Sequence, residues 1–255
     1  MYLQQSMKHS YPPKARPPEA EIDGVLLIDK GQDMTSHDVV AVARRRLNTR
    51  KIGHCGTLDP MATGLLILVV GKATRIQDLL MSEEKEYEGT LRLGASTSTQ
   101  DAEGEVLETK PVPELSAGEI SGAFGHFHGD FYQTPPMVSA IKKDGVPLYK
   151  LARKGQVVER EPRLVTVFQH QIRRIALPEI DFRVVCSKGF YVRTYCHDIG
   201  ERLGCGGHMA ALRRTRSGRF SVEGALTFAQ LKEVPSEEIL AKVLSLRDVS
   251  RLRGA

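Results

Sequence analysis

A short polar loop carries the side chains of this sequence that are best suited to chemistry. Residues 53–60, Gly-His-Cys-Gly-Thr-Leu-Asp-Pro, contain two glycines and a proline, which disfavour both a regular helix and a strand. The loop presents His54 and Asp59 directly before an apolar run at 65–70. A rigid loop could hold the Asp59 carboxylate for catalysis where a buried strand begins. An Asp-Pro pair is also a common turn former, and the residues alone favour that structural role.

Zinc binding and phosphate binding are the other chemistries to weigh. Four side chains could supply zinc ligands: Cys196, His197, Cys205 and His208. Cys196 and His197 are adjacent on an expected helix, so they point about 100° apart, and the spacing matches no common zinc pattern. We therefore expect no metal, with Cys196 in the core and His208 in a loop or at the start of a helix. The glycines near 204–207 lack the GxxxxGK[ST] pattern of a phosphate-binding loop.

The elements that must position the loop follow from hydrophobic periodicity and capping residues. We expect strands at 24–29, 65–70, 85–93, 105–109, 137–142, 163–175 and 182–187. We expect helices at 37–47, 73–80, 116–124, 148–154, 192–203, 226–232 and 239–246. Several of these strands follow one another without a helix between them, which favours an α+β fold with a mixed, largely antiparallel sheet.

Composition sets the class of protein. The chain has 255 residues, 41% of them hydrophobic, which is enough for one large domain. Its longest apolar run, at 65–70, is far too short to span a bilayer. Residues 1–22 lack the apolar segment of a signal peptide and are interpreted as a disordered leader. The four cysteines form no CxxC pair, which favours a reducing, cytoplasmic location.

Charge is distributed unevenly along the chain. The formal net charge is +5, but basic residues concentrate at 44–51, 142–174 and 183–219, whereas acidic residues concentrate at 83–119. Such asymmetry is typical of a protein with a basic face and a polyanionic partner. On charge alone, RNA or DNA binding and ordinary solvated helix faces are equal alternatives.

A family resemblance changes the weight given to Asp59. Residues 53–66, GHCGTLDPMATGLL, closely resemble the GHxGxLDPxAxGxL catalytic segment of TruB-type tRNA pseudouridine synthases. Further segments agree in order and spacing between about 24 and 231: Asp-Lys at 29–30, Lys-Glu-Tyr at 85–87, SKGFYVRT at 187–194, LGCGGH at 203–208 and LRR at 212–214. Gly31 stands where the family usually has proline. The resemblance assigns Asp59 as a nucleophile rather than a turn former.

The resemblance implies an isomerisation of uridine 55 in the T-loop of tRNA to pseudouridine, with no metal and no organic cofactor. It implies that Asp59 is the nucleophile and that Arg193 supplies its positive partner. Tyr87 would stack on the uracil and help to move a proton. The target uridine would have to leave its stack to reach the carboxylate.

The resemblance also implies a set of substrate-binding and RNA-binding residues: Lys30, His54, Lys188, Tyr191, Arg213 and Arg214. Among these, Lys30 and Tyr191 would position the Asp59 loop and the base. His54 would shape the loop near the flipped nucleotide rather than act as the general base. The basic segments 142–154 and 213–219 would grip the RNA backbone, with a strong salt dependence.

The expected organisation is one pseudouridine synthase catalytic domain at 23–255, without the C-terminal PUA domain that many bacterial members carry. We expect a monomer whose partner is the T-stem-loop of tRNA, with no membrane contact. A non-catalytic tRNA-binding or tRNA-folding protein is the alternative, because the basic segments alone would suffice for it.

Overall fold

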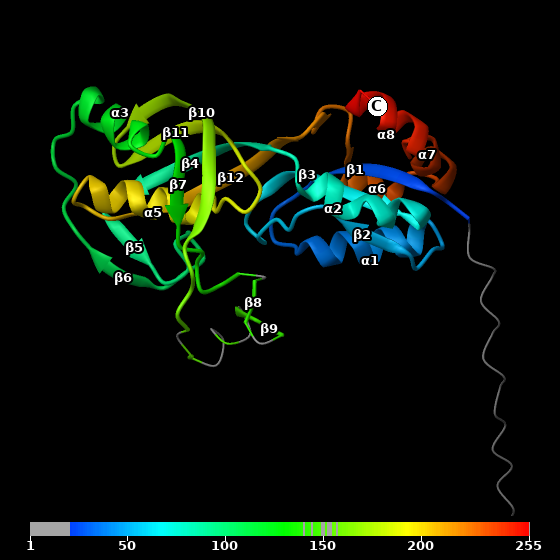
Figure 1. Ribbon diagram of the computed structural model, residues 1–255, viewed down its shortest axis with the longest axis horizontal. Coiled ribbons are helices and arrows are strands. Elements are labelled where there is room, and N and C mark those ends of the chain that lie inside the picture. The colour runs from blue at the N-terminus through cyan, green and yellow to red at the C-terminus, as the bar shows by residue number, and fades with distance from the viewer. Residues whose placement is uncertain are drawn as a thin grey trace, which may run out of the picture.

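The fold is organised around one long mixed sheet (Figure 1). The computed structural model describes residues 21–139, 141–143, 145–148, 151, 155–156 and 158–254. The ten-stranded sheet has the order β14-β1-β3-β12-β4-β11-β10-β7, with β2 beside β3 and β13 beside β12. Its strands are β1 (Gly24–Lys30), β2 (Ile52–His54), β3 (Thr63–Val70), β4 (Lys85–Leu93), β7 (Gly129–Gln133), β10 (Arg163–Ala176), β11 (Glu179–Cys186), β12 (Gly207–Ser217), β13 (Phe220–Ser221) and β14 (Leu226–Thr227).

Strand pairing in this sheet is mostly antiparallel. The β1–β14 and β3–β12 pairs are parallel, and the remaining pairs of the sheet are antiparallel. The predicted α+β class with a mixed, largely antiparallel sheet is therefore confirmed. Two short hairpins lie outside this sheet: β5 (Ala95–Thr97) with β6 (Val106–Thr109), and β8 (Lys142–Lys143) with β9 (Val146–Pro147).

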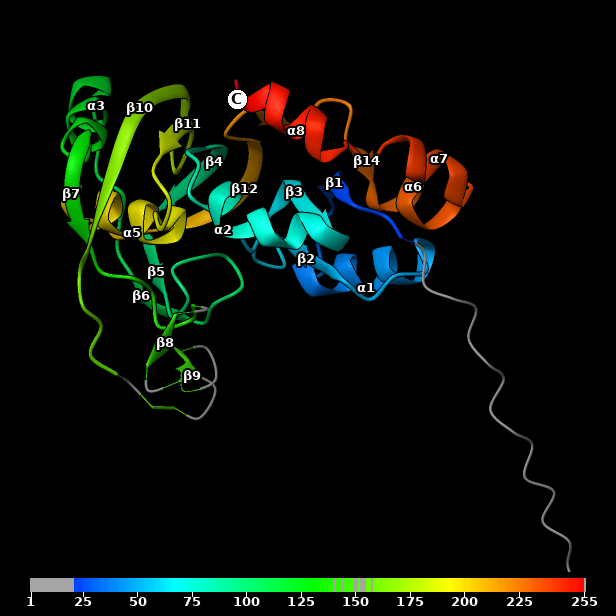
Figure 2. The same cartoon turned by 45° about the vertical axis from the view of Figure 1, so that its right-hand side comes forward.

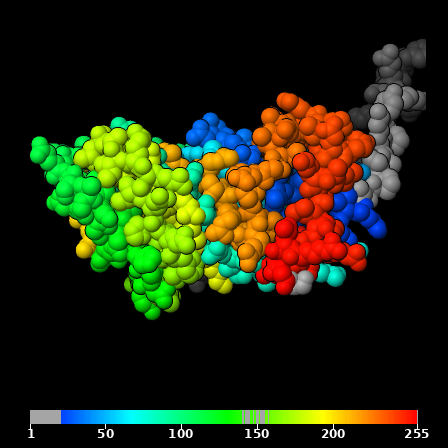
Figure 3. Space-filling model, turned by 90° about the horizontal axis from the view of Figure 1, so that it is seen from above, coloured from blue at the N-terminus to red at the C-terminus, as the bar shows by residue number. Residues whose placement is uncertain are grey.

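Helices cover the two halves of the sheet in separate groups (Figure 2). Near β4, β7, β10 and β11 lie α3 (Ala117–Gly125) and α5 (Val192–Arg202). Around β1 and β3 lie α1 (Ser36–Arg46), the 3₁₀ helix η1 (Gly71–Ile76), α2 (Gln77–Met81), α6 (Phe228–Glu233), α7 (Ser236–Ala241) and α8 (Leu246–Arg253). Seen from above, the β10 region and the C-terminal helices occupy opposite ends of the molecule (Figure 3). No helix in the described part of the chain has the length and apolar character needed to cross a membrane.

Strand β3 is buried on both faces, as its unbroken apolar sequence predicts. Leu66 and Leu68 belong to the main hydrophobic core, whereas Leu65 and Ile67 pack into a second cluster on the opposite face. A strand held from both sides gives the preceding loop a rigid base. The loop that carries Asp59 ends where this strand begins.

Several helix boundaries differ from the sequence prediction. Thr35 caps α1 in a reciprocal capping box with Asp38, as expected for this position. The predicted helix 73–80 is a 3₁₀ helix followed by α2, and the predicted helix 239–246 is replaced by the end of α7 and the start of α8. A capping box between Ser245 and Asp248 begins α8 there.

The predicted strand 137–142 is wrong. Residues 137–139 form bends, and regular pairing begins only at β8. Pro135 and Pro136 lack backbone N–H donors, which disfavours a strand through this segment. The sequence pattern did not predict strand β7. Residues 1–20 of the predicted leader, and most of the predicted helix 148–154, lie outside the described residues.

Candidate active site

The loop that carries Asp59 is fixed by side chains from neighbouring elements. Ser36, the first residue of α1, uses its hydroxyl twice: it accepts from the Leu58 N–H at 2.9 Å and donates to the Leu58 carbonyl at 3.2 Å. Lys30 at the end of β1 donates to the Pro60 carbonyl at 3.1 Å. These contacts hold the residues on either side of Asp59.

Arg214 supports the loop from below. Its side chain is fully buried, and it donates from Nε to the Leu65 carbonyl at 2.7 Å and from Nη2 to the Gly56 carbonyl at 3.0 Å. The guanidinium therefore ties the start of the loop to the start of β3. This is a structural role, which the sequence did not distinguish from RNA contact.

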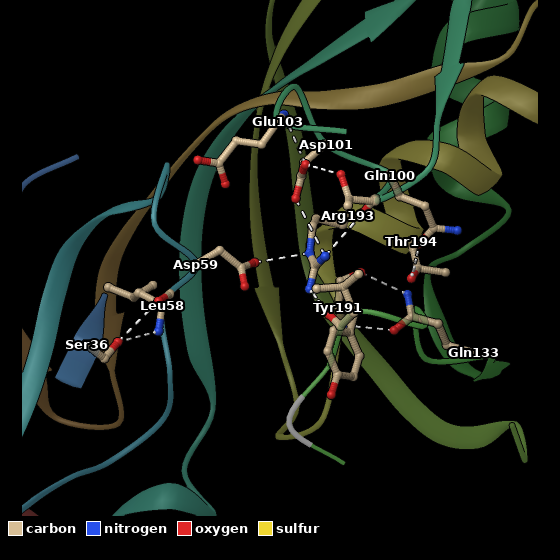
Figure 4. Close-up of polar contacts among 12 residues, drawn as sticks. Ser36, Leu58, Asp59, Gln100, Asp101, Glu103, Gln133, Tyr191, Arg193 and Thr194 are labelled. Carbon is tan, nitrogen blue, oxygen red and sulfur yellow. Dashed lines mark hydrogen bonds and ion pairs between the residues drawn. The ribbon is translucent and has the colours of Figure 1, made fainter. Parts of the chain in front are cut away.

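Arg193 meets Asp59 from the first turn of α5 (Figure 4). Its Nε lies 3.0 Å from Asp59 Oδ2, and the arginine side chain is 5% exposed whereas the aspartate is 34% exposed. The Nη1 group donates to the Thr99 carbonyl at 3.1 Å, and Nη2 donates to the Val138 carbonyl at 2.8 Å. The guanidinium is thus fixed from several segments that lie far apart in the sequence.

A second carboxylate flanks the same guanidinium. Asp101 is buried, and its Oδ2 lies 3.5 Å from Arg193 Nη1. Its Oδ1 accepts from the Thr99 hydroxyl and from the Glu103 backbone N–H. Asp101 does not stand out in the sequence, because the residues around it have the composition of an ordinary turn. No local pattern distinguishes an acid in a solvated turn from one folded against a buried arginine.

Tyr87 forms part of the wall of a cavity of about 680 Å³ that opens beside Asp59. Strand β4 alternates buried and more exposed residues, and Tyr87 is on its buried face. Burial raises the pKa of its phenol, so the hydroxyl stays protonated near neutral pH. Six of the predicted site residues line this cavity: Asp59, Tyr87, Lys188, Tyr191, Arg193 and Arg214.

The charge state of Asp59 depends on opposing effects. Burial raises its pKa above the ordinary value, and the nearby Asp101 adds to that rise. Arg193 and, more weakly, Lys30 oppose the rise. Burial lowers the pKa of Lys30 itself to about 8, which leaves its ammonium mostly charged at neutral pH. The site can therefore hold an anionic carboxylate beside a buried cation at the wall of an open cavity.

His54 and Arg213 do not line the cavity. The imidazole of His54 stands edge-on to His37 with ring centroids 5.4 Å apart, and burial lowers its pKa to about 4. A neutral imidazole fits a recognition role better than that of an acid at neutral pH. Arg213 forms a two-point ion pair with Asp29, at 3.0 and 2.7 Å.

Segment 213–219 was predicted to bind the RNA backbone, but most of its arginines are buried or paired with carboxylates of the same chain. Arg214 is buried, Arg213 pairs with Asp29, and Arg216 lies 2.8 Å from Glu84. Arg219, by contrast, is exposed. Most of the other predicted basic segment, 142–154, has side chains outside the described residues.

The side chains weighed as zinc ligands have structural roles. Cys196 is buried in the main core, as predicted. His208 lies in β12 rather than in a loop or at a helix start, and its Nδ1 is 3.0 Å from the Ala95 carbonyl. Among the residues that the structure describes, no three His, Cys, Asp or Glu side chains are placed to share a metal ion.

Comparison with known proteins gives matches along most of the chain. Residues 44–192 match the family described as TruB family pseudouridylate synthase (N terminal domain). Residues 193–249 match the tRNA pseudouridylate synthase B C-terminal domain. The chain is 58% identical over 227 residues to tRNA pseudouridine synthase B of Opitutus terrae, covering 89% of this chain and 94% of that protein. It is 48% identical to the protein of that name from Syntrophotalea carbinolica, covering 90% of this chain and 75% of the relative.

Solved structures agree in fold. A chain of a Cbf5-Nop10-Gar1 complex has a TM-score of 0.69 at 30% identity, covering 98% of this chain and 68% of the other. A chain of an H/ACA ribonucleoprotein bound to a substrate RNA containing 2′-deoxyuridine has a TM-score of 0.63 at 29% identity, covering 95% of this chain and 65% of the other.

Proposed function

This chain belongs to the TruB family of pseudouridylate synthases, which are isomerases, and we propose that it converts uridine 55 in the T-loop of tRNA to pseudouridine. The nucleophile is Asp59. The observation that carries this assignment is the 3.0 Å contact between Asp59 Oδ2 and Arg193 Nε at the wall of a cavity that also contains Tyr87.

The reaction rearranges bonds without net oxidation or reduction. Asp59 bonds to C1′ as the C1′–N1 glycosidic bond breaks, and the uracil turns while it remains bound. C5 then bonds to C1′ as the bond to Asp59 breaks, C5 loses its proton, and N1 gains one. An ionised aspartate needs no separate base to act as a nucleophile. Because Arg193 contacts Oδ2, the other oxygen of Asp59 is the one that meets the sugar. Arg193 stabilises the anion and fixes its direction.

The cavity supports a reaction on an extruded base. Flipping a nucleotide costs a few kcal/mol, and the cost is least where the base is already in a folded loop. Tyr87 offers an aromatic wall for the uracil and a phenol for proton movement. Because this cavity is open to solvent, the bound RNA would have to exclude the water that could otherwise hydrolyse an intermediate and release the base.

The remaining site residues divide by their positions. Lys188 and Tyr191 line the cavity and would meet the RNA. Lys30 and Arg214 act beneath the loop, because both are fully buried and donate to its carbonyls. His54 would shape the approach of the flipped nucleotide, whereas the pairing of Arg213 with Asp29 makes it a structural contact of β12.

The proposal extends to the organisation and location of the protein. One sheet includes strands from both ends of the described chain, with β14 beside β1 at one edge and β7 at the other, which supports one catalytic domain at 23–255. The four cysteines are all free and buried, as suits a cytoplasmic protein. The proposed partner is the T-stem-loop of tRNA, bound by a monomer.

The test is direct mapping of pseudouridine in an unmodified T-stem-loop after treatment with the purified chain. We expect modification at the T-loop uridine by the wild type and none by Asp59→Asn, which keeps the size of the side chain and removes its charge. Equal activity of Asp59→Asn would refute the assigned nucleophile. Binding of the RNA without modification by the wild type would instead support the non-catalytic tRNA-binding alternative.

A further inference from the structure

The first turn of α5 decides where Arg193 points. Tyr191 is the N-cap of this helix, with φ −110° and ψ 110°, and its side chain makes no capping hydrogen bond. Ser, Thr, Asp and Asn are the preferred residues at this position, because their side chains accept hydrogen bonds from the first N–H groups of the helix. Here the N-cap backbone is held instead by a side chain from another part of the fold.

That side chain is the amide of Gln133, the last residue of β7. It makes two reciprocal hydrogen bonds with the Tyr191 backbone (Figure 4). Gln133 Nε2 donates to the Tyr191 carbonyl at 3.1 Å, and the Tyr191 N–H donates to Gln133 Oε1 at 2.8 Å. The glutamine is 2% exposed, so water does not offer these groups an equal substitute.

The same Tyr191 carbonyl also starts the helix. It accepts from the Tyr195 N–H at 3.0 Å, the first helical hydrogen bond of α5. The Gln133 amide is therefore joined directly to the first turn, two residues before Arg193. The segment that follows β7 contacts Arg193 again, through the Val138 carbonyl at 2.8 Å from Nη2.

We propose that Gln133 is a positioning residue for pseudouridine formation: its amide fixes the Tyr191 backbone and so aims the Arg193 guanidinium at Asp59. The inference rests on the proposed function and deepens it. The backbone of Arg193 is held by Gln133 through Tyr191, and its guanidinium is held by backbone carbonyls and Asp101. Without the Gln133 amide, the backbone of Arg193 is no longer held in place.

A displaced Arg193 would affect chemistry more than RNA binding. Misplacement of a catalytic group by about 1 Å can cost roughly 100-fold in rate. The pKa of Asp59 should rise as well, because Arg193 opposes the raising effects of burial and Asp101, and only the weaker effect of Lys30 would remain. A rate loss accompanied by a shift of the acid limb is a signature that general destabilisation does not produce.

The test compares Gln133→Leu with the wild type in single-turnover pseudouridine formation across pH. We expect a rate on the order of 100-fold lower at neutral pH, a much smaller change in affinity for the T-stem-loop, and an acid limb displaced to higher pH. Gln230→Leu, at an exposed glutamine, is the control. It also removes a glutamine bond to a backbone N–H, that of Thr227 at 2.9 Å, but in α6 away from the cavity. The control should keep the wild-type rate and acid limb.

An unchanged rate in Gln133→Leu, or a lower rate with the acid limb in its wild-type place, would overturn the inference. If Gln133→Leu does not fold, Gln133→Glu replaces it, because its carboxylate still accepts from the Tyr191 N–H while the bond to the carbonyl is lost. For Gln133→Glu we expect the same shift of the acid limb with a smaller loss of rate. A wild-type rate and a wild-type acid limb in this variant would also overturn the inference. A wild type that forms no pseudouridine would refute the proposed function instead.

Discussion

Replacing Arg193 with methionine should destabilise the protein in a way that depends on pH. The variant keeps most of the side-chain volume but leaves Asp59 and Asp101 facing one another without the guanidinium between them. Removing one partner of a buried ion pair typically costs about 3–5 kcal/mol. Asp101 is buried, whereas Asp59 is 34% exposed, so we expect a loss near the lower end, about 3 kcal/mol.

The sign of the pH dependence follows from proton linkage. Without Arg193, the pKa of Asp59 in the folded state rises further above its unfolded value, because burial and the charge of Asp101 still raise it. At pH values between the unfolded-state pKa and the folded-state pKa of Asp59, the folded state binds more protons than the unfolded state. The free energy of unfolding therefore falls as pH rises through that range. The loss caused by Arg193→Met should therefore be larger at pH 7 than at pH 5.

Urea unfolding of wild type and Arg193→Met at the two pH values measures this difference. At about 2–4 °C per kcal/mol for a chain of this size, a loss of about 3 kcal/mol corresponds to a drop in Tm of roughly 6–12 °C at neutral pH. Adding Asp101→Asn to the variant should restore part of the stability, because one of the two unpaired charges is removed. An equal loss at both pH values would refute the ion-pair reasoning.

Other perturbations test separate parts of the site. The single-turnover rate of the wild type should fall at acid pH with a midpoint above about 3.9, the ordinary pKa of aspartate. The reason is that the ionised form of Asp59 reacts and burial raises its pKa. A midpoint at or below the ordinary value would contradict this. Lys30→Met should reduce stability in urea by about 1–3 kcal/mol, because the Pro60 carbonyl and two others lose a buried donor; wild-type stability would refute the anchoring role. Gly64→Ala should lower Tm and reduce activity, because Gly64 has φ +99° and a Cβ there would collide with the Arg214 backbone. An unchanged Tm would show that β3 and β12 can separate at this point without loss of stability.

Local patterns in the sequence predicted much of the architecture. Strand β3 was recognisable from six consecutive apolar residues, and α1 from a capping residue followed by helical periodicity. These signals are contained within about ten residues, so no knowledge of tertiary pairing is needed. Strand β7 was missed because its five residues, GDFYQ, show no clean alternation and its partner, β10, begins thirty residues later in the sequence.

The loop that carries Asp59 was predictable for a different reason than the elements around it. Its motif resembles a known family, which identified Asp59 and Arg193. Asp101 and Gln133 carry no such local mark, and their roles arise only when β7, α5 and the loop after β5 meet. The burial of Arg214 was also not predictable, because the sequence around a buried arginine does not differ from the sequence around an exposed one.

The arrangement around Arg193 also explains why the site contains a second aspartate. Asp59, Asp101, Arg193 and Lys30 together carry balanced charge when both carboxyl groups are ionised and Lys30 is protonated. In the proposed reaction, Asp59 loses its negative charge when its oxygen bonds to the sugar. Arg193 would then be a buried cation without a partner if Asp59 were its sole counter-ion, and such a charge is costly. Because Asp101 Oδ2 lies 3.5 Å from Arg193 Nη1, the guanidinium keeps an anionic neighbour through that step and can stay in place to receive Asp59 again when the carboxylate is released.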